Sequence, residues 1–88
     1  MSEMDIIATI DYNGHQIMVK GLESKISIEY DGKVVSRKKF ITRDKYWFQV
    51  YEKGEYVDYE IEVEYTPEGF IVKAYRNNVQ IFSKNRFF

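Results

Sequence analysis

Apolar and polar residues alternate along much of the chain with a period of two, which is the period of a β-strand that is buried on one face. The clearest example is residues 57–65, where a carboxylate separates each apolar or tyrosine residue from the next. We expect the apolar and tyrosine side chains to face a core and the carboxylates to face water. The expected core residues are Val57, Tyr59, Ile61, Val63 and Tyr65, and the carboxylates are Asp58, Glu60, Glu62 and Glu64.

Short turn sequences separate the alternating segments. Asn13-Gly14 and Asp31-Gly32 are two-residue sequences of the kind that joins the strands of a β-hairpin. The pattern predicts about eight short strands. They span residues 5–12, 15–20, 26–30, 33–40, 45–51, 55–65, 70–76 and 79–83. We expect residues 84–88 to form a tail that is either frayed or packed across a sheet edge.

Tight turns between consecutive strands favour a meander, so the predicted fold class is all-β. We expect a single antiparallel β-sandwich, with a small flattened barrel of strands as the alternative. Composition agrees, because 36 of the 88 residues are Ile, Val, Thr or aromatic, whereas the chain has one Leu and two Ala. A chain of this length forms one domain, residues 1–88.

Several classes of chemistry are excluded by the residues that the chain lacks. It has no cysteine and one histidine, His15, which removes disulfides, thiolate nucleophiles and His-rich metal sites within one chain. His15 follows the Asn13-Gly14 turn, where we expect it to be exposed. The carboxylates of residues 58–64 lie flat along a strand and do not wrap around a calcium ion, so we expect a solvated face opposite lysines such as Lys73. We predict no enzymatic activity, no cofactor and no metal site.

Charge is balanced overall but segregated along the chain. The 13 basic and 14 acidic residues give a formal net charge of -1, which argues against binding by bulk charge alone. Residues 33–45 carry six basic residues and one acid, a net +5, whereas residues 52–68 carry seven acids and one base, a net -6. The N-terminal segment is acidic and no long apolar run follows it, so we expect no secretory signal, no membrane insertion and a cytoplasmic protein.

The aromatic segment 45–51 is the strongest candidate for a binding surface. Tyr46 alternates with Trp47 along the strand, and Tyr51 shares the face of Trp47, so both faces carry aromatic side chains. Because Trp, Tyr and Arg dominate protein-binding hot spots, we predict a non-catalytic module that binds another protein. The basic run before this segment would supply orientation and association rate. The candidate binding residues are Arg37, Lys38, Lys39, Tyr46, Trp47 and Tyr51.

Other interpretations of the same residues remain open. Single-stranded nucleic acid would be bound by the basic strand 33–45 through its phosphates and by the aromatic strand 45–51 through stacking. However, Arg37 and Lys39 point away from Lys38 along a strand, which divides the basic patch between two faces. A small-ligand carrier, a structural accessory domain and self-association through an exposed sheet edge are the further alternatives.

Residues 26–48 contain a strand, Asp31-Gly32-Lys33, two valines, the basic run 37–39 and an aromatic strand. The later order is an acid-alternating strand, a turn, residues 75–79 and a short closing strand. Over residues 15–83 this order resembles the β-sandwich domain of the Fas apoptotic inhibitory molecule family, and also small uncharacterised prokaryotic β-domains. The resemblance implies a compact, non-enzymatic sandwich that acts by binding proteins, with no catalytic residues to carry over.

Overall fold

The computed structural model describes residues 5–87, and every regular element in them is a β-strand. The prediction of an all-β chain with eight strands is therefore confirmed. The strands are β1 (Asp5–Tyr12), β2 (His15–Leu22), β3 (Lys25–Tyr30), β4 (Lys33–Lys39), β5 (Arg43–Glu52), β6 (Glu55–Thr66), β7 (Gly69–Arg76) and β8 (Val79–Phe87). In this described part of the chain, no helix is available to cross a membrane.

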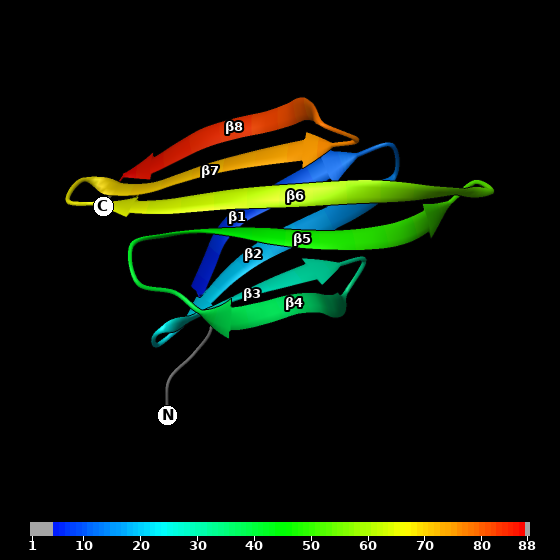
Figure 1. Ribbon diagram of the computed structural model, residues 1–88. Coiled ribbons are helices and arrows are strands. Elements are labelled where there is room, and N and C mark those ends of the chain that lie inside the picture. Colours follow the sequence, from blue (N-terminus) through cyan, green and yellow to red (C-terminus); the bar gives the residue numbers. More distant parts are fainter. Residues whose placement is uncertain (1–4, 88) are drawn as a thin grey trace.

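The strands form two four-stranded antiparallel sheets in the order of the sequence, β1-β2-β3-β4 and β5-β6-β7-β8. The two sheets pack face to face as a sandwich of about 40 × 27 × 19 Å (Figure 1). The chain passes from the first sheet to the second between β4 and β5, which lie at the same side of the sandwich, and β1 lies against β8 at the other side. Every other connection joins neighbouring strands within one sheet.

Turn residues in the left-handed backbone region fix the hairpins. Both central residues of the Asn13-Gly14 and Asp31-Gly32 turns have positive φ, between 48° and 85°. This is the conformation that twists two strands into a tight hairpin, and Asn, Asp and Gly adopt it most readily. The β5–β6 and β7–β8 turns use the same conformation, at residues 53–54 and 77–78.

The core lies between the sheets and is built from alternate residues of facing strands. Val57, Tyr59, Ile61 and Val63 of β6 are buried as predicted, and Ile17, Ile28 and Ala74 are among the residues of the other strands that join them. The prediction is wrong for Tyr65, whose side chain is 44% exposed. Tyr65 lies near the end of β6, where its ring packs edge-on against Phe70 and lines a hollow together with Glu23 and Phe40.

β8 continues beyond residue 83, where we expected it to end. Asn85 pairs with Ile71, and Phe87 pairs with Gly69, so the described part of the expected tail belongs to the second sheet. The backbone of β7 would otherwise present unpaired N–H and C=O groups along this stretch, and pairing with β8 satisfies them. Phe88 lies outside the described residues.

Candidate functional site

The basic run of β4 is divided between two faces, as its alternation predicted. Lys38 is paired with Ile26, a core residue, whereas Arg37 is paired with Ser27 and Lys39 with Lys25. Paired residues of antiparallel strands point to the same face of a sheet. Lys38 therefore points toward the inner side of the first sheet, and Arg37 and Lys39 point outward.

Lys38 and Tyr46 form a contact at the side of the sandwich where β4 meets β5. The Lys38 ammonium lies 4.9 Å from the centre of the Tyr46 ring and 3.0 Å from Oδ1 of Asp44. Tyr46 is fully buried, so it cannot touch a partner directly. Its role here is to fill the core and to support the Lys38 side chain by a cation–π contact.

Trp47 and Tyr51 lie on the outer face of the second sheet, where they are 62% and 64% exposed. Tyr51 makes an edge-on contact with Tyr56, whose ring centre is 5.1 Å away. The structure thus does not bring the six candidate residues together into one aromatic and basic face. β4 and β5 are consecutive in sequence but belong to different sheets, and the outer faces of the two sheets point in opposite directions.

The acidic strand β6 runs through the middle of this outer face, beside the basic beginning of β5. Arg43 is paired with Glu64, and Glu62 lies between Lys45 on β5 and Lys73 on β7. The expectation that Lys73 lies opposite the row of carboxylates is therefore confirmed. Exposed neighbours of opposite charge at such positions contribute at most from a few tenths of a kcal/mol to about 1 kcal/mol each.

The other two carboxylates of the row, Asp58 and Glu60, have different neighbours. Glu60 lies between Trp47 on β5 and Tyr75 on β7, and Asp58 accepts a hydrogen bond from the Gln49 amide at 2.8 Å. A hollow of about 60 Å³ opens here. We call the outer surface formed by these aromatic and acidic side chains the aromatic–acid surface. It comprises Trp47, Tyr51, Tyr56, Asp58, Glu60 and Tyr75.

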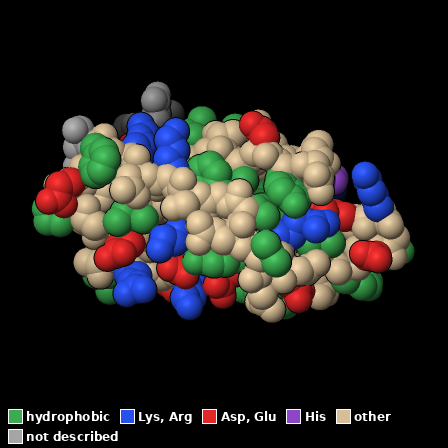
Figure 2. Space-filling model, turned by 90° about the horizontal axis from the view of Figure 1, so that it is seen from above, with side chains coloured by type: hydrophobic (Ala, Val, Ile, Leu, Met, Phe, Trp, Pro, Cys, Tyr) green, Lys and Arg blue, Asp and Glu red, His purple; other side chains and the backbone are tan. Residues whose placement is uncertain are grey.

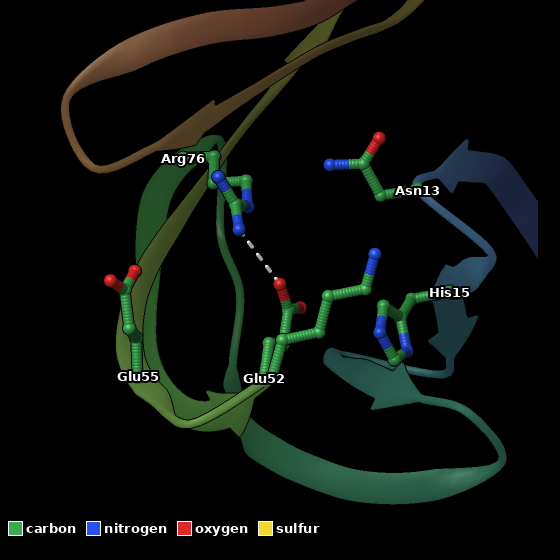
Figure 3. A pocket seen from close by; sticks show the side chains of 6 residues that line it. Asn13, His15, Glu52, Glu55 and Arg76 are labelled. Atoms are coloured by element: carbon green, nitrogen blue, oxygen red, sulfur yellow. Dashed lines mark hydrogen bonds and ion pairs between the residues drawn. The ribbon is translucent and has the colours of Figure 1, made fainter.

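A second polar cluster lies at one end of the sandwich and centres on Glu52, which is only 6% exposed. One carboxylate oxygen, Oε2, accepts hydrogen bonds from the hydroxyls of Tyr30 and Tyr59, the latter at 2.7 Å. The other oxygen, Oε1, accepts a bond from Nη2 of Arg76 at 2.9 Å (Figure 3). The Arg76 guanidinium also lies over the ring of Tyr12, 5.5 Å from its centre.

The charges of this cluster follow from its bonds. Burial alone would raise the pKa of Glu52, but the bonds donated by Tyr30, Arg76 and Tyr59 outweigh burial and hold that pKa below its usual value. Burial and the neighbouring carboxylate raise the pKa of Tyr59 to about 12, and they raise the pKa of Tyr30 as well. Glu52 is therefore a carboxylate at neutral pH and is poorly suited to donate a proton.

The cluster ties the two sheets together. Tyr30 belongs to β3 of the first sheet, whereas Glu52 and Arg76 belong to β5 and β7 of the second. Tyr12 of β1 makes the second connection through its contact with Arg76. A buried polar group whose bonding capacity is used in this way stabilises one arrangement of the surrounding elements.

His15 is not the exposed turn residue that we expected, because it is half-buried and has two partners. Its Nδ1 lies 2.7 Å from Oδ2 of Asp31, and its ring stacks on Tyr30 with the ring centres 5.2 Å apart. The proximity of His15 and Asp31 could have been predicted from the sequence. The two-residue turns before β2 and after β3 bring both residues to the same end of the first sheet.

The hollow beside His15 has a volume of about 130 Å³. Asn13 and His15 lie on one side of it, and Glu52 and Arg76 lie on the other (Figure 3). A catalytic triad needs a nucleophile beside the histidine, and none of the residues that line this hollow is Ser, Thr or Cys. Over residues 5–87, no group of three His, Asp or Glu side chains is arranged to hold a metal ion.

Comparisons with known proteins add no identification. No protein-family model matches the chain, and no curated protein or solved structure was found to match it.

Proposed function

We propose that the protein is a non-catalytic module that binds another protein through the aromatic–acid surface of its second sheet. The observation that carries the proposal is the exposure of Trp47, Tyr51 and Tyr56 on one face of two neighbouring strands. We further propose that it acts in the cytoplasm without a cofactor, as its sequence led us to expect.

The physical support is the nature of the exposed side chains and of their scaffold. Trp and Tyr bury a large area at a low cost in conformational entropy, which makes them frequent hot spots of protein interfaces. Here they project from paired strands rather than from loops, so the surface is held rigidly in the free protein. A surface that is already ordered loses little further entropy on binding.

The distribution of charge favours a protein partner over nucleic acid. Arg37 and Lys39 lie on the outer face of the first sheet, on the opposite side of the sandwich from Trp47 and Tyr51. The aromatic side chains have the carboxylates of β6 beside them, which repel phosphate. The side of the molecule seen in Figure 2 shows basic and acidic side chains interspersed with hydrophobic ones, rather than a field of one sign.

Site-directed cross-linking tests the proposal. A photoreactive amino acid at position 51 should capture a partner in cells, whereas the same amino acid at position 37 on the opposite face should not. The captured protein is then purified and titrated against wild type, Trp47→Ala and Arg37→Ala. We expect saturable binding that Trp47→Ala weakens by about 30-fold or more, which corresponds to at least about 2 kcal/mol, and that Arg37→Ala leaves within about twofold.

Two results would overturn the proposal. A partner captured equally well from positions 37 and 51 would show that no particular face is used. If the titrated partner is a second copy of this chain, the surface is a self-association interface instead.

A further inference from the structure

We propose that the hollow between Trp47 and Tyr75 binds the guanidinium group of an arginine side chain that the protein partner presents. This inference rests on the proposed function, because it assigns the chemistry of the partner at the same surface. The geometry, the charges and the shape of the ligand group support it in turn.

The geometry places one carboxylate between two aromatic rings. Glu60 is directly opposite Trp47 on β5 and directly opposite Tyr75 on β7, so the three side chains form one row across three strands. Side chains in such a row have Cβ atoms about 4.5–5.5 Å apart, which is within contact of a group seated over Glu60. The hollow measures about 60 Å³, and Asp58, Tyr59 and Asn78 complete its lining. This volume suits the end of one side chain and is well below the roughly 300 Å³ of the smallest typical metabolite pockets.

The register of the strands shows which carboxylates have no basic residue opposite them. Glu62 and Glu64 lie directly opposite lysine or arginine, as described above. Glu60 has only aromatic residues opposite it, and Asp58 has Gln49. Within residues 5–87 none of these four carboxylates forms an ion pair, so the difference between them is which residues lie opposite. The uncompensated negative charge thus coincides with the aromatic part of the surface.

A guanidinium group matches both features at once. It is planar, stacks on aromatic faces, and donates paired N–H bonds to a carboxylate. A lysine ammonium would satisfy the charge, but it is a compact point charge that holds its water more strongly. An acidic or phosphorylated segment would be repelled by Asp58 and Glu60.

Trp47 is the only tryptophan of the chain, so its fluorescence reports directly on this hollow. We would titrate the protein at low salt with a Gly/Ser hexapeptide that contains one arginine, and with the same peptide carrying citrulline, which keeps the shape and loses the charge. We expect a saturable change in Trp47 fluorescence with the arginine peptide, and binding at least about tenfold weaker with the citrulline peptide.

Variants test the assigned residue. Glu60→Gln should weaken binding of the arginine peptide by about fivefold to tenfold. Glu64→Gln is the matched control, because it removes a carboxylate of the same strand that has an arginine opposite it, and it should change binding by less than about twofold. Unchanged circular dichroism and melting temperature of both variants would exclude unfolding as the cause.

Equal binding of the arginine and citrulline peptides, or no loss in Glu60→Gln, would overturn the inference. A lysine peptide that binds as tightly as the arginine peptide would overturn the assignment to guanidinium. The proposed function is overturned by a different result, namely a partner that binds Trp47→Ala as tightly as it binds wild type. If partner binding depends on Trp47 but not on Glu60, the proposed function stands and the arginine site does not.

Discussion

Substitution of Glu52 by glutamine removes the charge from the cluster that joins the two sheets while keeping the shape of the side chain. Glutamine has one carbonyl oxygen in place of two carboxylate oxygens, so it cannot accept bonds from Tyr30, Tyr59 and Arg76 together. Whichever way its amide is turned, at least one donor of the cluster is left unsatisfied. The Arg76 guanidinium also loses its counter-ion.

The expected magnitude follows from burial. Breaking a buried ion pair from one side costs about 3–5 kcal/mol, and the loss of a hydrogen bond to a charged group costs about 1.5–3 kcal/mol. The Glu52 side chain is 4% exposed but that of Arg76 is 25% exposed, so water can solvate part of the guanidinium in the variant. We therefore expect Glu52→Gln to lower the free energy of unfolding by about 2–3 kcal/mol, which in a domain of this size lowers the melting temperature by roughly 10–20 °C.

Urea denaturation followed by circular dichroism measures this effect. Glu55→Gln is the matched control, because Glu55 lines the same hollow beside His15 as Glu52 but is exposed. This substitution should change the free energy of unfolding by less than about 0.5 kcal/mol. Tyr30→Phe should cost about 1–1.5 kcal/mol, and the double variant with Glu52→Gln should cost less than the sum of the two single variants because both disturb the same bonds. A Glu52→Gln variant as stable as Glu55→Gln would refute the idea that the cluster holds the sheets together.

Four further outcomes are expected. The pKa of Glu52 is lower in the folded state than in the unfolded state. The stability that its carboxylate contributes is therefore complete above the unfolded pKa and is lost as pH falls through the folded pKa. The difference in melting temperature between wild type and Glu52→Gln should accordingly shrink below about pH 4. The pKa of Tyr59 is raised instead, so its contribution should be lost as pH rises from about 10 towards its folded value of about 12. Gly69→Ala should lower the free energy of unfolding, measured by urea denaturation, by about 3 kcal/mol or more. The reason is that φ of Gly69 is +148° and an added Cβ would overlap the backbone carbonyl of Arg86. Trp47→Ala should melt within a few degrees of wild type while losing partner binding, since the side chain is mostly exposed.

These outcomes have their own controls. Gly32→Ala tests backbone strain without a clash, because φ is +85° and nothing lies within 4 Å of the added atom, so it should cost only about 1 kcal/mol. A Gly69→Ala variant no less stable than Gly32→Ala would contradict the close packing of β7 against β8. A difference between wild type and Glu52→Gln that stays constant from pH 7 to pH 2 would contradict the pKa argument.

The strands and hairpins could be predicted because the signals for them are local. Alternation in residues 57–65 shows which side chains share a face, and Asn13-Gly14 and Asp31-Gly32 have few backbone alternatives. Alternation does not show how completely the end of a strand is covered, which is why Tyr65 was assigned to the core. The extension of β8 past residue 83 depends on pairing with β7, a contact that the pattern of β8 alone does not encode.

The candidate site could be predicted only in part. The spacing of Trp47 and Tyr51 along β5 shows that they share a face, but not that this face is the exposed one, because Tyr46 and Phe48 make the other face aromatic too. Their separation from Arg37 depends on the point at which the chain passes from one sheet to the other, and the sequence between β4 and β5 does not mark that point. The residues of the Glu52 cluster come from β1, β3, β5, β6 and β7, so no local sequence motif predicts it.

Chemical-shift mapping with the purified partner tests the central claim most directly, since it reports every residue of the free surface at once. We predict that binding shifts the Trp47 indole resonance and the backbone amides of residues 47–51 and 56–60, and leaves those of residues 33–39 in place. Shifts confined to β1–β4, with Trp47 unaffected, would contradict the assignment of the second sheet as the binding face.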